Sequence, residues 1–143
     1  MSEPDPAIEA LARAWVGTPF RPQGRTSRGL DCLGLVVVVA RGAGRRVEDV
    51  RDYGWRPHAP DRVAEGLRAQ GFTPLPLTAA RPGDVLMATP GGGLVHFAIR
   101  SAQGVIEADV RCRRVVERPL RPDDAWHSAW RFPGRGPTAV GVG

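Results

Sequence analysis

The sequence predicts one α+β domain in which N-terminal helices pack on a meandering antiparallel sheet of four to six strands. Two observations carry this prediction. Apolar residues recur at helical spacing before residue 72, and short runs of β-forming residues separated by turn residues follow it. The 143 residues have the size of a single domain with one core. We expect this domain to span residues 1–133, with residues 134–143 as a tail rich in glycine and proline.

A first helix is expected over residues 6–16, where Pro6 suits the first turn and apolar side chains form one stripe. The stripe consists of Ile8, Leu11 and Trp15. Residues 18–29 form a loop rich in turn residues and positive charge, which could wall a cleft. A short amphipathic helix is expected over residues 61–71, with Asp61 as its N-cap.

Between these two helices, a third is expected to start after Asp31 and to place Cys32 in its first turn. The unpaired N–H groups and the positive end of the helix dipole favour a thiolate there, as a nucleophile requires. A buried strand over residues 35–40 is the alternative, because periodicity cannot separate the two in so short an apolar run. In that case Cys32 is a small core residue.

The second half of the chain reads as strands. They are expected at residues 85–88, 94–99, 105–108, 114–117 and 129–132. Alternation along a strand places His96 with small or aliphatic neighbours, and Glu107 on the next strand could accept a hydrogen bond from its ring. A helix thiol, an imidazole base and a carboxylate that orients the base form an activated nucleophile. Taken singly, His96 also fits a half-buried structural histidine and Glu107 a solvated strand residue.

The amino-acid composition says little about which class of partner the protein binds. The net charge of +5 comes almost entirely from arginine and favours anionic partners without choosing among them. The N-terminus has no signal-peptide pattern, and no apolar run reaches the roughly 18 residues of a membrane span, so we expect free thiols rather than a Cys32–Cys112 disulfide. Cys112, among arginines, is either a second nucleophile or a strand filler.

Several segments together resemble the NlpC/P60 cysteine peptidases, in the short form encoded in phage and gene-transfer-agent tail clusters. They are residues 17–20 (GTPF), 29–36 (GLDCLGLV), 81–85 (RPGDV), 95–99 (VHFAI), 105–108 (VIEA) and 130–133 (WRFP). The resemblance implies a papain-like fold and cleavage of peptidoglycan peptides, typically beside D-glutamate and diaminopimelate. By motif match, Cys32 is the nucleophile, His96 the general base and Glu107 the residue that orients it.

Two positions depart from the family pattern. Phe20 stands where the family usually has tyrosine, and Glu107 stands where a polar residue, often histidine, is usual. We expect Phe20, Arg28, Asp31 and Tyr53 to bind substrate, although Tyr53 could as easily cap a core. No cofactor or metal is expected.

The resemblance predicts a peptidoglycan-degrading peptidase carried on a phage-like tail tip. It would be made in the cytoplasm and act in the cell envelope of the recipient, with tail or baseplate proteins as further partners. The first alternative is a structural tail component of the same fold with little activity. The second is a nucleic-acid-binding protein, which rests on the basic charge alone and explains neither Cys32 nor His96.

Overall fold

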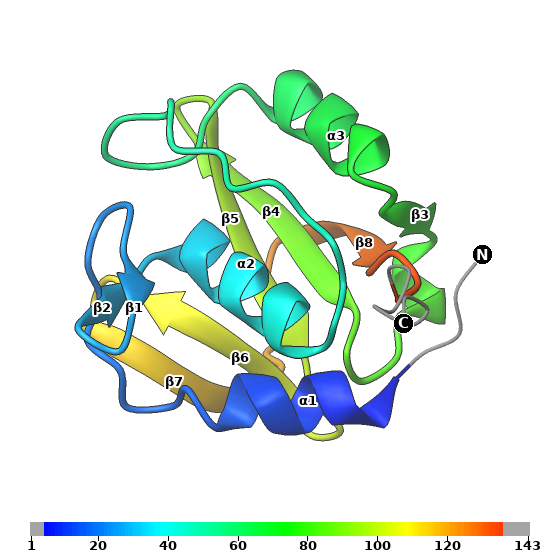
Figure 1. Cartoon of the computed structure of the whole chain (residues 1–143), viewed down its shortest axis with the longest axis horizontal. Coiled ribbons are helices and arrows are strands. Elements are labelled where there is room, and N and C mark those ends of the chain that lie inside the picture. The colour runs from blue at the N-terminus through cyan, green and yellow to red at the C-terminus, as the bar shows by residue number, and fades with distance from the viewer. Residues whose placement is uncertain (1–4, 136–143) are drawn as a thin grey trace, which may run out of the picture.

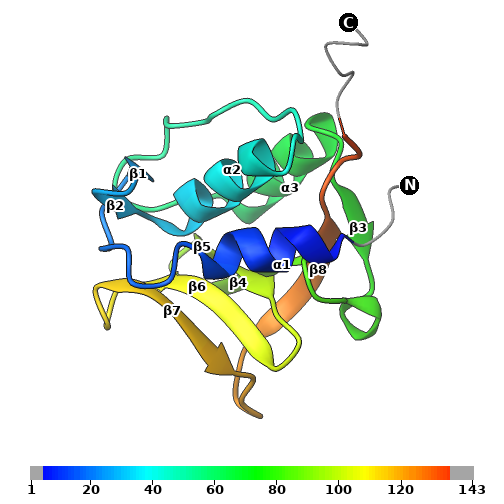
Figure 2. The same cartoon turned by 60° about the horizontal axis from the view of Figure 1, so that its bottom comes forward.

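A computed structural model describes residues 5–135 and contains three α-helices. These are α1 (Pro6–Arg13), α2 (Cys32–Gly42) and α3 (Pro60–Ala69), and a short 3-10 helix, η1 (Leu77–Ala79), lies between the first two strands of the main sheet. Figures 1 and 2 show the helices on one side of a twisted sheet. The predicted tail lies outside the described residues from position 136 onward.

Six antiparallel strands form the main sheet in the order β3-β8-β4-β5-β6-β7. They are β3 (Thr73–Leu75), β4 (Val85–Gly91), β5 (Leu94–Arg100), β6 (Gly104–Asp109), β7 (Arg114–Pro119) and β8 (Trp126–Arg131). A separate two-stranded hairpin, β1 (Arg25–Thr26) with β2 (Gly29–Leu30), leads into α2. The predicted α+β class is therefore confirmed, at the upper end of the expected strand number.

The main core lies between the sheet and α2. Helix α2 buries most of its surface, including Leu35 and Val39, against Phe97 and Ile99 of β5. The apolar run that follows Cys32 is thus a helix, and its length of 11 residues exceeds that of a typical buried strand. A smaller cluster packs on the opposite face of the sheet.

Two helix ends differ from the prediction. Helix α3 starts at Pro60, one residue before the expected Asp61, and its N-cap is Ala59 in a left-handed conformation without a side-chain cap. Helix α1 ends at Arg13 rather than at residue 16. Just beyond, the Gly17 N–H donates to the Val115 carbonyl, so contact with β7 takes the chain out of the helix.

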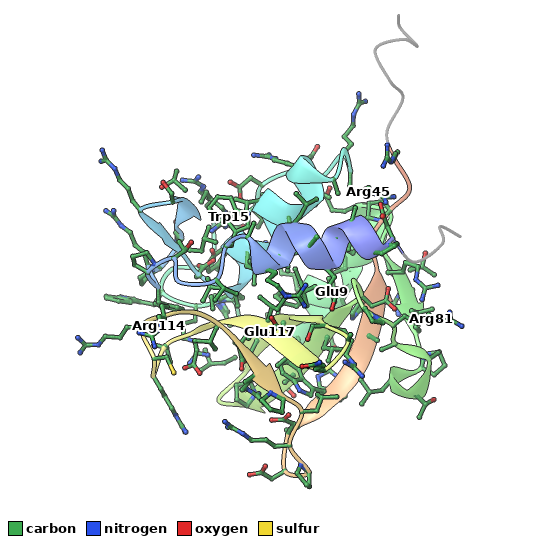
Figure 3. The ribbon with its side chains drawn as sticks, turned by 90° about the horizontal axis from the view of Figure 1, so that it is seen from below. Glu9, Trp15, Arg45, Arg81, Arg114 and Glu117 are labelled. Atoms are coloured by element: carbon green, nitrogen blue, oxygen red, sulfur yellow. The ribbon has the colours of Figure 1, made fainter. Side chains whose placement is uncertain are left out.

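Charged side chains fasten α1 to the sheet. Arg13 forms ion pairs with Glu9 (3.1 Å) and with Glu117 of β7 (2.8 Å), and Glu9 also accepts a hydrogen bond from the Ala102 N–H. Figure 3 shows Glu9 and Glu117 in the space between α1 and the β6–β7 end of the sheet. Helix α1 is therefore a fixed support behind α2.

Strands β5 and β6 diverge where the site lies. They pair at Ile99 with Ile106 and at Arg100 with Val105. Figure 1 shows them separating beyond these pairs, toward the end of α2 that begins with Cys32. This divergence leaves space for a helix terminus beside side chains of both strands.

Candidate active site

Cys32 is the first residue of α2, and Asp31 is the N-cap. The Asp31 carboxylate accepts a hydrogen bond from the Gly34 N–H at 2.7 Å, as the sequence pattern predicts for a helix start. The thiol is buried, with the side chain 4% exposed, and its Sγ lies 4.0 Å from the Val95 carbonyl oxygen of β5. The first turn of the helix therefore holds the thiol against the strand that carries His96.

Gly34 allows the first turn of α2 to lie directly on the preceding loop. A Cβ atom at this position would stand 2.1 Å from the Gly24 carbonyl oxygen, a distance that the backbone cannot accommodate. Only glycine fits without moving the loop. The close approach fixes Cys32 relative to the loop that carries Phe20, which lines the cleft.

His96 and Glu107 meet across the gap between β5 and β6. His96 Nε2 lies 2.7 Å from Glu107 Oε1, and the Cys32 side chain is close enough to the ring to influence its protonation. Because an ionised carboxylate only accepts, Nε2 carries a proton and donates it to Glu107. Nδ1 is then the ring nitrogen that remains to exchange a proton with the Cys32 thiol. The structure brings the three residues together in the order thiol, imidazole and carboxylate.

The surroundings of His96 favour its charged form. Burial of the ring opposes protonation, but hydrogen bonds and charge interactions with Cys32 and Glu107 outweigh burial and raise the pKa of His96 to about 9. Burial likewise opposes ionisation of Glu107, yet His96 and Arg118 together lower the pKa of Glu107. At neutral pH the pair is therefore an imidazolium and a carboxylate.

Three further residues reach the site without having been predicted from the sequence. Arg118 of β7 donates to the second carboxylate oxygen of Glu107, and Asp124 holds the Arg118 guanidinium through two hydrogen bonds. The Trp126 ring stacks on His96, with centroids 5.7 Å apart. Opposite charges on neighbouring strands were the available signal, but their pairing depends on a register that the sequence leaves open.

A cleft of about 590 Å³ opens over Cys32, His96 and Glu107. Phe20 lines it from the loop before β1, and Trp55, 80% exposed, stands on the connection between α2 and α3. Charged side chains of both signs also line the cleft. They are Arg56, Asp109, Arg111, Arg121 and Asp123. Of the four predicted substrate-binding residues, Phe20 is the one whose side chain suits that role.

Asp31 lines the cleft but its carboxylate is fully engaged within the protein. It is 1% exposed and accepts from the Gln23 N–H at 2.8 Å, from Arg25 at 3.1 Å and from the Tyr53 hydroxyl at 2.5 Å, besides the helix N–H. No acceptor position is left for a substrate. The structure therefore gives Asp31 a structural role.

Tyr53 and Arg28 lie away from the cleft. The Tyr53 hydroxyl is buried between Asp31 and Arg25, and burial followed by the hydrogen bond to Asp31 raises the pKa of Tyr53 above its usual range. Its ring lines a second cavity, apolar and about 350 Å³, between α2 and α3. Arg28 is exposed at the turn between β1 and β2 and does not line the cleft.

Within residues 5–135, no group of three or more His, Cys, Asp or Glu side chains is placed to hold a metal ion. In that same part of the chain, no helix has the length and apolar character that crossing a membrane requires. Cys112 is free and exposed on the turn between β6 and β7.

Comparison with solved structures finds NlpC/P60 domains. The NlpC/P60 domain of the peptidoglycan hydrolase SagA is 28% identical, with a TM-score of 0.62, over 87% of this chain and 97% of that domain. The peptidoglycan hydrolase RipB of Mycobacterium tuberculosis is 23% identical, with a TM-score of 0.62, over 89% of this chain and 63% of RipB. A P60 domain of an antigen from M. avium subspecies paratuberculosis is 22% identical, with a TM-score of 0.63, over 90% of this chain and 96% of that domain.

These comparisons confirm the predicted fold: the chain has the NlpC/P60 fold. A scan of protein-family models and a search of curated protein sequences find no match to this chain.

Proposed function

We propose that this protein is a peptidoglycan hydrolase of the cysteine peptidase type, which cleaves peptide bonds of murein. The observation that carries the proposal is the thiol–imidazole–carboxylate arrangement at the floor of an open cleft. Its support is the fold shared with domains of peptidoglycan hydrolases, one of them 28% identical. Digestion of purified peptidoglycan tests it directly.

The geometry supports a two-step acyl transfer. In the resting site the proton of the thiol already lies on Nδ1 of the His96 imidazolium, so the Cys32 thiolate attacks the carbonyl carbon of the scissile amide. The resulting oxyanion lies near backbone N–H groups in the first turn of α2, which stabilise it. The intermediate collapses as the imidazolium gives its proton to the leaving amine, and a thioester remains. Water, deprotonated by the neutral His96, then attacks the thioester, the acid leaves, and the thiolate–imidazolium pair is restored.

The two departures from the family pattern affect this mechanism differently. Phe20 lines the cleft without a hydroxyl, so it offers the substrate an apolar surface and no hydrogen bond. Glu107 is an anion rather than a neutral partner, so it stabilises the charged ring of His96. Glu107 thus favours a thiolate–imidazolium pair. Phe20 is the departure that favours the alternative of a structural component with little activity.

The pH dependence of activity should report the His96–Glu107 pair. A ring with its pKa raised to about 9 is protonated below that value, so kcat/KM should hold to about pH 9 and fall above it as the imidazolium is lost. The Glu107→Gln variant removes the anion and should move this alkaline limb down by about one to two pH units. His127→Gln, at an exposed position of β8, is the control. An unchanged limb in Glu107→Gln would show that Glu107 does not set the protonation of His96.

The finer proposal is that the enzyme acts beside D-glutamate and diaminopimelate and is carried on a phage-like tail. Its support is the resemblance of the Cys32, His96 and Glu107 segments to the tail-associated form of the family. Carriage would deliver the domain from the cytoplasm to the envelope of the recipient cell, where its substrate lies.

Carriage predicts a role for the segment after the domain. Deleting residues 134–143 should leave the domain folded and Cys32 reactive, because the described core and site lie before this segment. Incorporation into purified particles, measured by mass spectrometry, should fall. The control is a chain in which residues 134–143 are replaced by a Gly/Ser linker of equal length. Unchanged incorporation of both chains would mean that docking runs through the domain surface.

A further inference from the structure

We propose that Arg118 is a positioning residue of this site: it holds Glu107 against His96 and limits how strongly that carboxylate favours the protonated ring. The inference rests on the proposed function, because it assigns His96 to the reaction. Arg118 itself acts through Glu107, because its hydrogen bonds go to Glu107, Asp124 and the Pro119 carbonyl.

The first observation is that Glu107 uses one oxygen for each partner. Its Oε1 accepts from His96 and its Oε2 accepts from Arg118 Nε. Its side chain is 6% exposed, so solvent cannot take over either bond easily. A carboxylate held at both oxygens has one orientation, and that orientation presents Oε1 to the imidazole.

The second observation is that Arg118 is itself fixed. Asp124, on the connection between β7 and β8, accepts from Arg118 through both carboxylate oxygens, at 3.0 and 3.1 Å. Asp124 in turn accepts from the Arg121 N–H at 2.8 Å, and Arg118 also donates to the Pro119 carbonyl at 3.0 Å. A bidentate pair restrains a guanidinium in plane and in direction. The cation therefore cannot leave Glu107 without breaking the turn that precedes β8.

The third observation is that Trp126 contacts the His96 ring directly. Trp126 follows Asp124 by two residues, and its ring stacks on His96 at an interplanar angle of 25°. The segment from Arg118 to Trp126 thus reaches His96 twice, at the Nε2 edge through Arg118 and Glu107 and at the face through Trp126. Both contacts oppose rotation of the ring away from Cys32.

The charges around His96 explain the second part of the proposal. Cys32 on α2 and Glu107 on β6 both favour the imidazolium. Arg118 on β7 is paired with Glu107, and a cation at that place opposes a positive charge on the ring. Asp31 is paired with Arg25, and Arg118 is shared between Glu107 and Asp124. The neighbours Ala88 of β4 and Trp126 of β8 bring no ionisable side chain to the ring. Charged residues of both signs line the same cleft, and Arg118 is the cation among them that is bonded to Glu107; the others are Arg56, Asp109, Arg111, Arg121 and Asp123. Arg118 is therefore the cation that offsets the field of Glu107.

The test replaces the charge of Arg118 and follows the protonation of His96. The full chain has three histidines, so the His96 signals in an NMR titration can be assigned with His58→Gln and His127→Gln. Arg118→Met should raise the pKa of His96 by about half to one unit, move the alkaline limb of kcat/KM upward equally, and reduce kcat/KM at pH 7 about tenfold. Glu107→Gln should lower both the pKa of His96 and the pH of the alkaline limb. Arg118→Lys, which keeps the charge without the fork, should leave the limb in place and lower kcat severalfold.

Opposite shifts in Arg118→Met and Glu107→Gln would support the proposal, because general loosening of the site would move both variants the same way. A shift of Arg118→Met downward, or none, would overturn it. Arg118→Gln, which removes the charge but keeps a donor for Glu107, decides the matter if Arg118→Met does not fold. The NMR titration needs no substrate, so a shift without peptidoglycan cleavage would uphold the role of Arg118 and refute the proposed function.

Discussion

Replacing Cys32 by alanine should abolish release of soluble peptide fragments from purified peptidoglycan, with a loss of at least about a thousandfold. The reason is that the cleft holds a single thiol. The other cysteine, Cys112, is exposed on the β6–β7 turn and does not line the cleft. Mass analysis of the released fragments provides the measurement, and it also identifies the bond that is cut.

The matched control is Cys112→Ala, which removes the same group and should digest peptidoglycan like the wild type. Equal digestion by wild type and Cys32→Ala would end the peptidase proposal. Absence of digestion by the wild type, with Cys32 alkylated by iodoacetamide no faster than Cys112 at neutral pH, would instead favour a structural component of the same fold.

Replacing Asp31 by alanine should lower the free energy of unfolding by about 3 to 5 kcal/mol. The carboxylate accepts hydrogen bonds from two main-chain N–H groups, Arg25 and Tyr53, all in a region closed to solvent. Its loss leaves a buried Arg25 with Asp49 as its remaining ionic partner and removes the N-cap of α2, which alone contributes about 1 kcal/mol. Urea unfolding followed by tryptophan fluorescence measures the difference.

Asp52→Ala is the control for this experiment. Asp52 also forms an ion pair, with Arg62 at 3.6 Å, but both side chains are exposed, so its loss should change stability by less than about 0.5 kcal/mol. If Asp31→Ala kept the stability of the wild type and instead weakened substrate binding, the role first predicted for Asp31 would be right and the structural one wrong.

The parts of the fold that depend on local pattern could be predicted from the sequence. Glycine and proline marked most element ends, and alternation placed His96 on a strand face away from the buried side chains of Phe97 and Ile99. Asp31 was predicted as a helix start because an N-cap needs a short polar side chain. The prediction that Cys32, His96 and Glu107 lie close together followed from the order of these elements along the chain.

Features that depend on long-range contact could not be predicted. Tyr53 is followed by Trp55 in a polar connection, and nothing local distinguishes the buried ring from the exposed one. Arg118 looks like one more cation on a solvent-facing strand, and its contact with Glu107 arises from a register that pairs Val105 with Arg118 and Glu107 with Val116. The N-cap at Ala59 has a left-handed backbone without a side-chain cap, and an alanine carries no local signal for either feature.

The contacts that brace the site have a consequence for how the molecule can be divided. The bonds that secure the nucleophile, centred on Asp31, join residues between positions 23 and 53, and those that secure the base join residues between 96 and 126. The contacts that hold Cys32 and those that hold His96 thus each come from one continuous stretch of chain. The two groups of residues form one site only where α2 packs on β5, so a chain interrupted between residues 53 and 96 should recover the site when the two pieces recombine.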